Sequence, residues 1–249
     1  MNTIVNSEKT SSEAHTRKVH KLVLAGYAAA SILIMIVYII LDMPYFYWQS
    51  VGTLFILPLL WGVYRMLGMR PVHRLDIVVV CYTFLAYTIG VVLRAYKVIP
   101  FYDKLMHMMS GTLTMMLAYP VFYLLKPNHT VERRDFPLAA IFCLCAAIAF
   151  AGLWEIGEYI ICLLTGIDTQ VVQTAGIHDT MQDMIVCTIG ALAFLPFMGE
   201  VFHKKPARLF MVPSDDFIQI CPLTQGMALE DAAQNKVANP MDSASYACK

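Results

Sequence analysis

Six long apolar runs constrain this chain more than any other feature of its sequence. A transmembrane α-helix needs about 20 consecutive, mostly apolar residues to cross roughly 30 Å of hydrocarbon. Hydrophobic residues make up 58% of the 249 residues and charged residues only 14%, which lies outside the usage of soluble proteins. The sequence therefore predicts an all-α integral membrane protein with six transmembrane helices, in the runs 22–41, 51–67, 77–93, 105–125, 137–163 and 183–202.

Local features refine three of these helices. No small-residue cleavage site follows the run 22–41, so this run is interpreted as an uncleaved first helix rather than a signal peptide. The second helix is the weakest prediction, because the run 51–67 is short and contains Pro58 and Arg65. In the fourth helix, Pro120 lacks a backbone N–H and is expected to cause a kink.

Basic residues indicate the orientation of the chain. If the N-terminus is inside, thirteen Lys and Arg residues up to Arg208 fall on the inner side, before Lys236 and Lys249 are counted, and only Arg94, Lys97 and Lys104 fall on the outer side. Cytoplasmic loops are enriched in Lys and Arg, so both termini are predicted to be cytoplasmic. The expected organisation is a cytoplasmic N-terminal segment (1–21), a six-helix transmembrane domain (22–202) and a mostly disordered cytoplasmic tail (203–249).

The composition of the predicted tail shifts toward Asp, Ser, Pro, Asn and Gln. Such a segment has few apolar residues to bury, so few contacts with the helices are expected. Truncation after Arg208 is therefore expected to leave the fold intact. A short helix around 227–237 is the one ordered element considered for this stretch.

Three pairs of ionisable residues lie at the ends of apolar runs with one-turn spacing: Asp103 with His107, Glu155 with Glu158, and Asp179 with Asp183. Residues three or four apart share one face of a helix. A carboxylate inside a membrane-spanning segment is costly unless it meets a partner or water, and by default it indicates a functional site. In the predicted orientation all three pairs lie at the outer membrane face. The sequence thus predicts one outward-facing Asp/His/Glu site between the fourth, fifth and sixth helices.

Small residues continue the polar faces of these helices toward the membrane interior. Ser110 and Gly111 follow His107, and Gly190 follows Asp183 on the sixth helix. Because small residues allow helix backbones to approach closely, the fourth, fifth and sixth helices are expected to pack around the polar site.

Two classes of function are compatible with this site. In the first, all six residues are catalytic, and a divalent metal ion such as Mg²⁺, Mn²⁺ or Zn²⁺ activates water against a lipid or envelope-derived phosphate or ester. The predicted metal ligands are His107, Glu155, Glu158 and Asp183. In the second, the cluster is a cation or proton site in a small transporter or in an envelope-associated binding protein. The sequence has no nucleophile elbow, which weakens the enzyme class. It also lacks a basic aromatic surface, which excludes nucleic acid as a partner.

A purely structural role is an alternative for three of the acids. Asp179 and Asp103 would then be helix N-caps, and Asp183 would be stabilised by the helix dipole. Glu155 and Glu158 do not fit this alternative, because they lie at the C-terminal end of their predicted helix, where the dipole disfavours negative charge.

Three motifs resemble a known family. The runs Asp103-Lys104-x-x-His107-x-x-x-Gly111, Trp154-Glu155-x-x-Glu158 and Asp179-Thr180-Met181-Gln182-Asp183-Met184 are similar to those of the YjdF-type inner-membrane proteins of bacteria. The Asp-Lys-x-x-His opening, the later Glu and the Asp before a small, Gly-rich helix more distantly resemble VanZ-like proteins. The resemblance covers roughly residues 70–200 and implies a multi-pass protein of the bacterial cytoplasmic membrane, with membrane lipids and a lipid or envelope-derived ligand as its partners. YjdF-type proteins have no settled biochemical activity, and His178 beside Asp179 departs from their pattern.

Overall fold

The structure is a computed structural model that describes residues 2–66, 68–126, 130–166, 176–203 and 211–221. All regular structure in these residues is helical, as predicted. Among them, six helical segments are long and apolar enough to cross a membrane: Glu13–Ile40, Pro44–Met66, His73–Val92, Tyr102–Leu125, Arg133–Thr165 and His178–Phe202. The predicted all-α multi-pass membrane protein is therefore confirmed, while the assignment of its two faces to cytoplasm and exterior stays a prediction.

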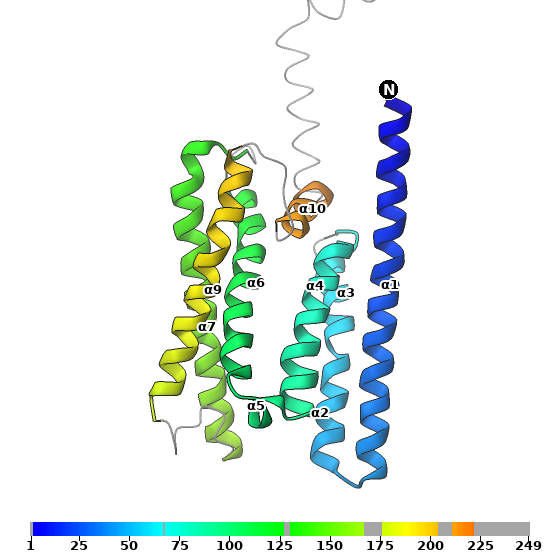
Figure 1. Ribbon diagram of the computed structural model, residues 1–249, viewed down its shortest axis with the longest axis vertical. Helices are drawn as coiled ribbons and strands as arrows, with labels where there is room; N and C mark the ends of the chain where they lie inside the picture. Colours follow the sequence, from blue (N-terminus) through cyan, green and yellow to red (C-terminus); the bar gives the residue numbers. More distant parts are fainter. Residues whose placement is uncertain (1, 67, 127–129, 167–175, 204–210, 222–249) are drawn as a thin grey trace, which may run out of the picture.

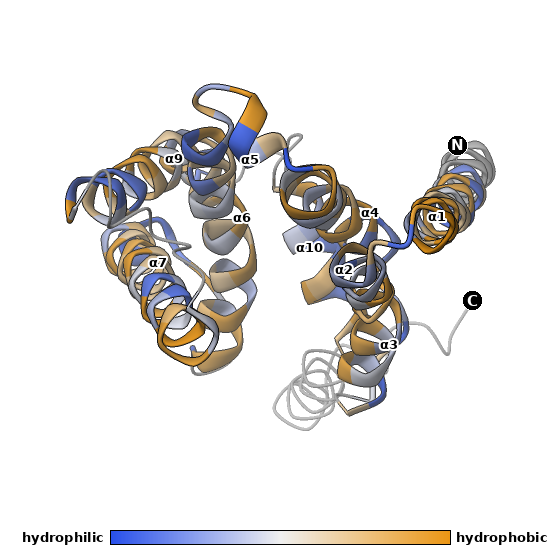
Figure 2. Ribbon diagram, turned by 90° about the horizontal axis from the view of Figure 1, so that it is seen from below, coloured by the Kyte–Doolittle hydropathy of each residue, from blue (hydrophilic) through white to orange (hydrophobic). Residues whose placement is uncertain are grey.

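The helices form two groups (Figures 1 and 2). One group contains α1 (Asn2–Ile40), α2 (Pro44–Leu54), α3 (Ile56–Met66), α4 (His73–Thr83) and its π-helical continuation η1 (Phe84–Val92). The other is a three-helix bundle of α6 (Tyr102–Leu125), α7 (Phe136–Thr165) and α9 (His178–Phe202). Three short elements complete the part of the chain that the structure describes: α5 (Ala95–Val98), η3 (Arg133–Asp135) and α10 (Val212–Ile220).

The first helix is longer than its membrane-spanning part. The polar stretch 1–21 was predicted to be a separate cytoplasmic segment, whereas α1 is continuous from Asn2 to Ile40. Its membrane-spanning part begins at Glu13, so one helix carries the polar residues directly into the apolar run.

The second and third spans are irregular helices. Pro58 cannot donate a backbone hydrogen bond to the carbonyl of Leu54. The helix is therefore interrupted at Phe55, between α2 and α3. The weakly predicted second helix is thus present, but in two pieces. The third span changes from an α-helix to a π-helix at Phe84, a geometry that is rare and often found at functional sites.

The bundle is held together by a close contact between α6 and α9. A Cβ atom added at Gly111 would lie 1.9 Å from the carbonyl oxygen of Cys187, and one added at Gly190 would lie 1.9 Å from that of Met108. The two backbones therefore touch at positions where a side chain has no room. Thr112 strengthens the contact by donating a hydrogen bond from its hydroxyl to Gly190 O, over 3.0 Å. This confirms the close approach predicted from the small residues.

Residues 211–221 are an ordered part of the stretch that was predicted to be mostly disordered. Here α10 packs between α4 and α6 (Figure 1), and Ser214 is fully buried. α6 continues through Pro120, which has no N–H to donate to the carbonyl of Met116, four residues earlier. The Ser214 hydroxyl donates to that carbonyl over 2.6 Å, so α10 satisfies a buried acceptor that the proline leaves without its helical donor. The helix considered at 227–237 lies outside the described residues.

A second contact ties α10 to the other helix group. Arg74 Nη1 on α4 lies 3.0 Å from Asp216 Oδ2 and 3.1 Å from Asp216 Oδ1. Apolar residues on either side of α10 are also buried, including Met211 and Cys221. α10 therefore joins the two helix groups at one end of the molecule.

The α6–α9 contact predicts a strong effect of a single methyl group. Gly190→Ala places a Cβ against the Met108 carbonyl, so α6 and α9 must separate, which we expect to cost about 3 kcal/mol. The thermal unfolding midpoint of the detergent-solubilised protein should drop clearly. Gly157→Ala is the matched control, because a Cβ on this helical glycine meets nothing within 4 Å. Equal midpoints for the two variants would contradict the contact.

The docking of α10 predicts that Ser214→Ala is destabilising. The variant leaves the buried Met116 carbonyl without its donor, at a cost of about 1–3 kcal/mol. Gln219→Ala, at an exposed position of the same helix, should leave the unfolding midpoint close to that of the wild type. Truncation after Arg208 removes all of α10 and should lower the midpoint further. A truncated protein as stable as the full chain would show that the tail does not support the fold.

Candidate functional site

The first turns of α6 and α9 meet at one end of the bundle (Figure 1), and they bring together four of the six predicted site residues. Phe101 has left-handed backbone angles, with φ of 61°, and turns the chain into α6. Asp103 and His107 then lie on successive turns of α6, and Asp179 and Asp183 lie on successive turns of α9.

The structural alternative of helix caps is wrong for both aspartates to which it was applied. The residue at the N-cap position is Phe101 in α6 and Ile177 in α9, and neither cap has a side-chain hydrogen bond. Asp103 and Asp179 lie inside the first turns, where the helix dipole still favours their negative charge. Asp183 lies one turn deeper and is only 2% exposed, so a different partner must stabilise it.

That partner is Lys104. Its ammonium nitrogen lies 2.6 Å from Asp179 Oδ1, 2.8 Å from Asp183 Oδ1 and 3.4 Å from Asp103 Oδ2. One lysine thus binds three carboxylates from two helices. From the sequence, Lys104 was only one of three basic residues predicted at the outer face, although a lysine directly after Asp103 at the start of a span was the available signal.

His107 completes the cluster from the side of α6. Its Nε2 lies 3.6 Å from Asp103 Oδ1 and 3.9 Å from Asp183 Oδ1, and the residue is 9% exposed. The ring is close to the α6–α9 contact, where the Ser110 hydroxyl donates to His107 O and lies 3.6 Å from Cys187 Sγ. The helix contact therefore determines how His107 and Asp183 face each other.

Three ligand atoms of this cluster can hold a metal ion. One atom each from Asp103, His107 and Asp183 lie within 4.8 Å of one another. The predicted ligands were His107, Asp183 and the two glutamates. His107 and Asp183 belong to the group of three close atoms, whose third member among the described residues is Asp103, so the predicted ligand set stays a prediction.

Glu155 and Glu158 lie beside the cluster on α7. Glu155 is buried, at 5% exposure, and its charge acts on His107. Glu158 accepts a hydrogen bond from Trp154 Nε1 over 2.9 Å. It is also close enough to Asp103 and Asp183 for their negative charges to act on its carboxyl group. The glutamates thus contribute to the electrostatics of the site without joining the group of three ligand atoms.

A tyrosine outside the membrane spans borders the same acids. Tyr96 on α5 packs against Gly90, where an added Cβ would lie 2.4 Å from its ring. Burial of the phenol raises the pKa of Tyr96, and negative charge on groups that include Asp103 and Glu158 raises it further. The phenol therefore keeps its proton and remains a neutral hydrogen-bond donor at the edge of the acidic site, a role that the sequence did not suggest.

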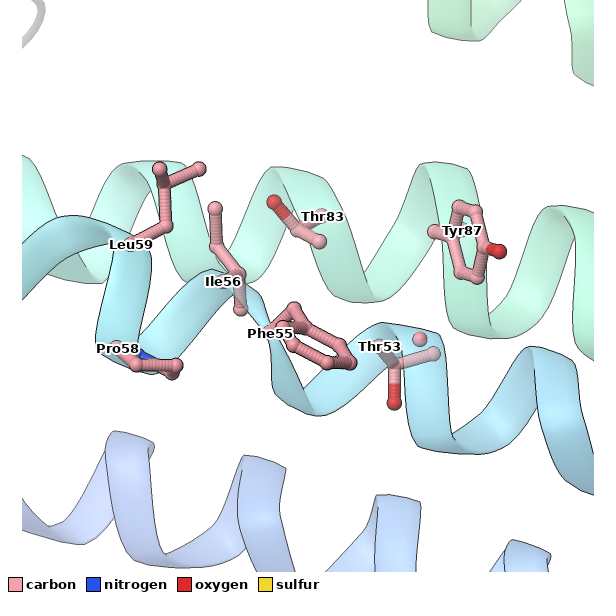
Figure 3. A pocket seen from close by; sticks show the side chains of 8 residues that line it. Thr53, Phe55, Ile56, Pro58, Leu59, Thr83 and Tyr87 are labelled. Carbon is pink, nitrogen blue, oxygen red and sulfur yellow. The ribbon is translucent and has the colours of Figure 1, made fainter.

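An apolar cavity lies in the other helix group (Figure 3). It has a volume of about 520 Å³ and lies where the α2–α3 break faces the junction of α4 and η1. Its lining consists of Gly52, Thr53, Phe55, Ile56, Pro58, Leu59, Thr83 and Tyr87. Since none of these side chains carries a charge, the ionisable cluster is the better candidate for chemistry.

The three-carboxylate contact predicts that removing the lysine charge is costly. Lys104→Met leaves Asp183 buried without its ammonium partner, and breaking such a pair costs about 3 kcal/mol. We expect a lower unfolding midpoint for this variant. Lys97→Met, at an exposed lysine in the neighbouring segment, is the control and should change little. A Lys104→Met protein with wild-type stability would show that the lysine does not neutralise these acids.

Comparisons with known proteins agree with the membrane fold. The model of a family described as predicted membrane protein (DUF2238) matches residues 20–205, more than half of the chain. No curated protein and no solved structure matches the chain. The matched segment contains all six membrane spans except the first residues of α1, and it includes the whole polar cluster. The chain therefore belongs to the DUF2238 family of predicted membrane proteins.

Proposed function

We propose that Asp103, His107 and Asp183 bind a divalent metal ion, and that the protein is a metal-assisted enzyme acting on a lipid or envelope-derived substrate at the membrane surface. The observation that carries this proposal is the convergence of three ligand atoms from two helices within 4.8 Å. Two carboxylates and one imidazole suit a hard or borderline cation such as Mg²⁺, Mn²⁺ or Zn²⁺.

The spacing of the ligand atoms is close to that of a bound ion. The imidazole nitrogen lies 3.6 Å and 3.9 Å from the two carboxylate oxygens. Two ligands of one Zn²⁺ ion, each about 2.1 Å from the metal, lie roughly 3.4 Å apart in a tetrahedral site. The imidazole therefore needs shifts of a few tenths of an ångström. The most widely separated ligand atoms, within 4.8 Å of each other, must approach by up to about 1.4 Å, which side-chain rotation on fixed helices supplies.

Lys104 indicates that the site stabilises positive charge. Its ammonium contacts the same Asp183 oxygen that faces His107, at 2.8 Å. A metal ion and this ammonium compete for one carboxylate, so metal binding displaces Lys104 toward Asp179 or Asp103. We infer that the lysine maintains the acidic site when no metal is bound and weakens its affinity for metal.

The depth of the site favours surface chemistry over transport. Substrate sites of secondary transporters usually lie near the bilayer midplane. Here the ligands lie in the first two turns of α6 and α9, at the ends of their spans, where lipid headgroups and water are within reach. A bound divalent ion would supply activated water or polarise a phosphate or ester. Glu155 and Glu158, next to the ligands, are then candidates for proton transfer, with Asp179 positioning Lys104.

A second candidate function is a small cation- or proton-coupled transporter or an envelope-associated binding protein. The observation that favours it is a second buried acid in another span, because Asp76 on α4 is 4% exposed and pairs with a histidine. Buried ionisable groups in several spans are typical of proton pathways.

The family context supports a cellular location for either function. We propose that the chain is a YjdF-type member of its family and lies in the bacterial cytoplasmic membrane, with the ionisable cluster facing outward. The motifs around Asp103, Glu155 and Asp179 support the YjdF-type assignment, and the excess of basic residues at the other face supports the orientation. The likeness to VanZ-like proteins rests on these motifs alone.

Metal binding provides the test. Chelator-treated protein in detergent should gain thermal stability on addition of Mn²⁺ or Zn²⁺, with saturation at about one ion per chain by elemental analysis. Asp183→Asn and His107→Gln should abolish this gain. Lys104→Met, although less stable without metal, should bind the ion at least about tenfold more tightly, because its competitor is gone. Asp42→Asn is the control, as it neutralises an exposed acid at the same end of the molecule.

The outcomes separate the candidate functions. Metal-dependent release of a water-soluble product from anionic lipid vesicles supports the enzyme, whereas metal or proton flux into proteoliposomes without a product supports the transporter. Glu158→Gln combined with Asp183→Asn should be non-additive in either case, since both charges act on one site. A protein that binds no metal and whose stability is unaffected by all of these cations would overturn the metal site.

A further inference from the structure

A second network of polar side chains lies at the opposite end of the molecule, where α1, α3 and α4 meet. The Tyr64 hydroxyl on α3 donates to Asp76 Oδ1 on α4 over 2.6 Å. The other oxygen, Asp76 Oδ2, lies 2.9 Å from His20 Nε2 on α1. His20 Nδ1 in turn lies 3.1 Å from Nδ1 of His73, the first residue of α4.

Burial distinguishes this network of polar side chains from a surface ion pair. Tyr64 is 5% exposed, Asp76 4% and His20 7%, whereas His73, the last residue of the network, is partly exposed. Three buried polar residues thus connect to solvent through one histidine ring. A buried polar group is costly without partners, so the contacts fix where the protons lie.

The charge of Asp76 favours one tautomer of His20. Its Oδ2 lies 2.9 Å from Nε2, at an angle that does not make a hydrogen bond, and its negative charge favours a proton on that nitrogen. A neutral His20 then has no proton on Nδ1. This nitrogen is an acceptor, and it faces His73 Nδ1, which must supply the proton between the two rings. The rings lie with their centroids 4.6 Å apart.

We propose that His20 and His73 form a proton-binding site that shares one exchangeable proton between their facing Nδ1 atoms and links α1 to α4. The site accepts its proton through the partly exposed His73 ring. Asp76, held by Tyr64, keeps the second nitrogen of His20 protonated. This is the arrangement in which an acid orients a histidine so that its other nitrogen is free to bind.

The charges around the site explain why it takes up a proton and not a metal ion. Arg17 on α1 acts on His73, as do Asp76 on α4 and Asp216 on α10. Arg74 on α4 neutralises Asp216 through their 3.0 Å contact. With Arg17 near and Asp76 on the far side of His20, only two nitrogens face the shared position. Two ligands beside a guanidinium suit a proton but hold a divalent ion poorly.

The neutral pair carries one proton on each ring, so two further protons are needed to make both rings cationic and to change the contact between the helices. If both rings are cationic, each Nδ1 carries an N–H group, and the two groups point at each other across 3.1 Å. The His20–His73 contact must then open, while His20 keeps its ion pair with Asp76. Acidification therefore separates the start of α4 from α1. The site shares no residue with the Asp103–His107–Asp183 cluster, so this inference does not depend on the proposed metal site.

Histidine tautomers test the proposal directly. In ¹⁵N-histidine-labelled protein in lipid bilayers, nitrogen NMR at about pH 7.5 should show His20 protonated at Nε2 and bare at Nδ1, and His73 protonated at Nδ1. Titration to about pH 5 should change both Nδ1 signals together and remove the correlation across the hydrogen bond. His20 protonated at Nδ1, or two rings that titrate independently, would overturn the shared proton.

Two variants make the test specific. His73→Phe keeps a flat ring next to His20 but cannot share a proton, so acid should no longer shift the His20 Nδ1 signal in a coupled step. His15→Phe removes an exposed histidine from the same helix and should leave both site signals unchanged. A coupled step that survives in His73→Phe would also overturn the proposal. If His73→Phe does not fold, the tautomer pattern and the coupled titration of the wild-type protein alone decide.

Discussion

The contact of α6 and α9 at Gly111 and Gly190 is the interaction on which the polar cluster depends. Both glycines place their backbone against the carbonyl of the other helix, so the distance between the helix axes is as short as the backbones allow. His107 lies one turn from Gly111, and Asp183 lies two turns from Gly190. Any separation of the backbones would therefore move His107 and Asp183 apart, and the charges of the cluster would lose their partners. The close packing of α6 against α9 thus keeps the ionisable side chains of the cluster together.

A similar dependence operates at the other end of the bundle. Pro120 leaves the Met116 carbonyl without its helical donor, and in a membrane-embedded helix such a group needs a partner from elsewhere. Ser214 supplies the partner from α10, which Arg74 also holds through Asp216. The short helix α10 therefore supplies the hydrogen-bond donor that α6 lacks at Pro120, and it connects α6 to α4. The proline costs little because a distant part of the chain compensates for it.

Features that depend on residues close together in the sequence could be predicted, whereas contacts between distant parts of the chain could not. Hydropathy identified all six spans, because the length of an apolar run reports the thickness of the membrane directly. One-turn spacing within helices predicted which acids lie together, since Asp103, His107, Asp179 and Asp183 each follow from local periodicity. The central role of Lys104 could not be predicted in this way, because a side chain that reaches another helix depends on the crossing angle.

The remaining errors have the same origin. His20 and His73 meet over 53 positions of sequence, and Ser214 reaches Met116 over 98, so no local pattern connects them. α10 is short and carries two aspartates and a proline, which gave its stretch the composition of a disordered tail. Its order comes from tertiary contacts, and composition alone contains no information about a partner elsewhere in the chain. That Asp103, and neither Glu155 nor Glu158, belongs to the group of three candidate ligand atoms is likewise a matter of which helix lies nearer.

The separation of the two polar sites bears on which function the fold can support. Beyond the Asp103–His107–Asp183 cluster, the middle of the three-helix bundle is filled by Met115, Phe194 and Met198, each at most 1% exposed. Close-packed apolar side chains leave no room for water, and an ion crossing such a layer loses its hydration without gaining ligands. An ion bound at the Asp103–His107–Asp183 cluster would therefore have to come from the membrane face at which the cluster lies. A transporter built on this chain would have to open the contact of α6 and α9, which the backbone packing at Gly111 and Gly190 opposes. The surface chemistry that we propose needs only the movement of the Lys104 side chain, so it is compatible with helices that stay in place.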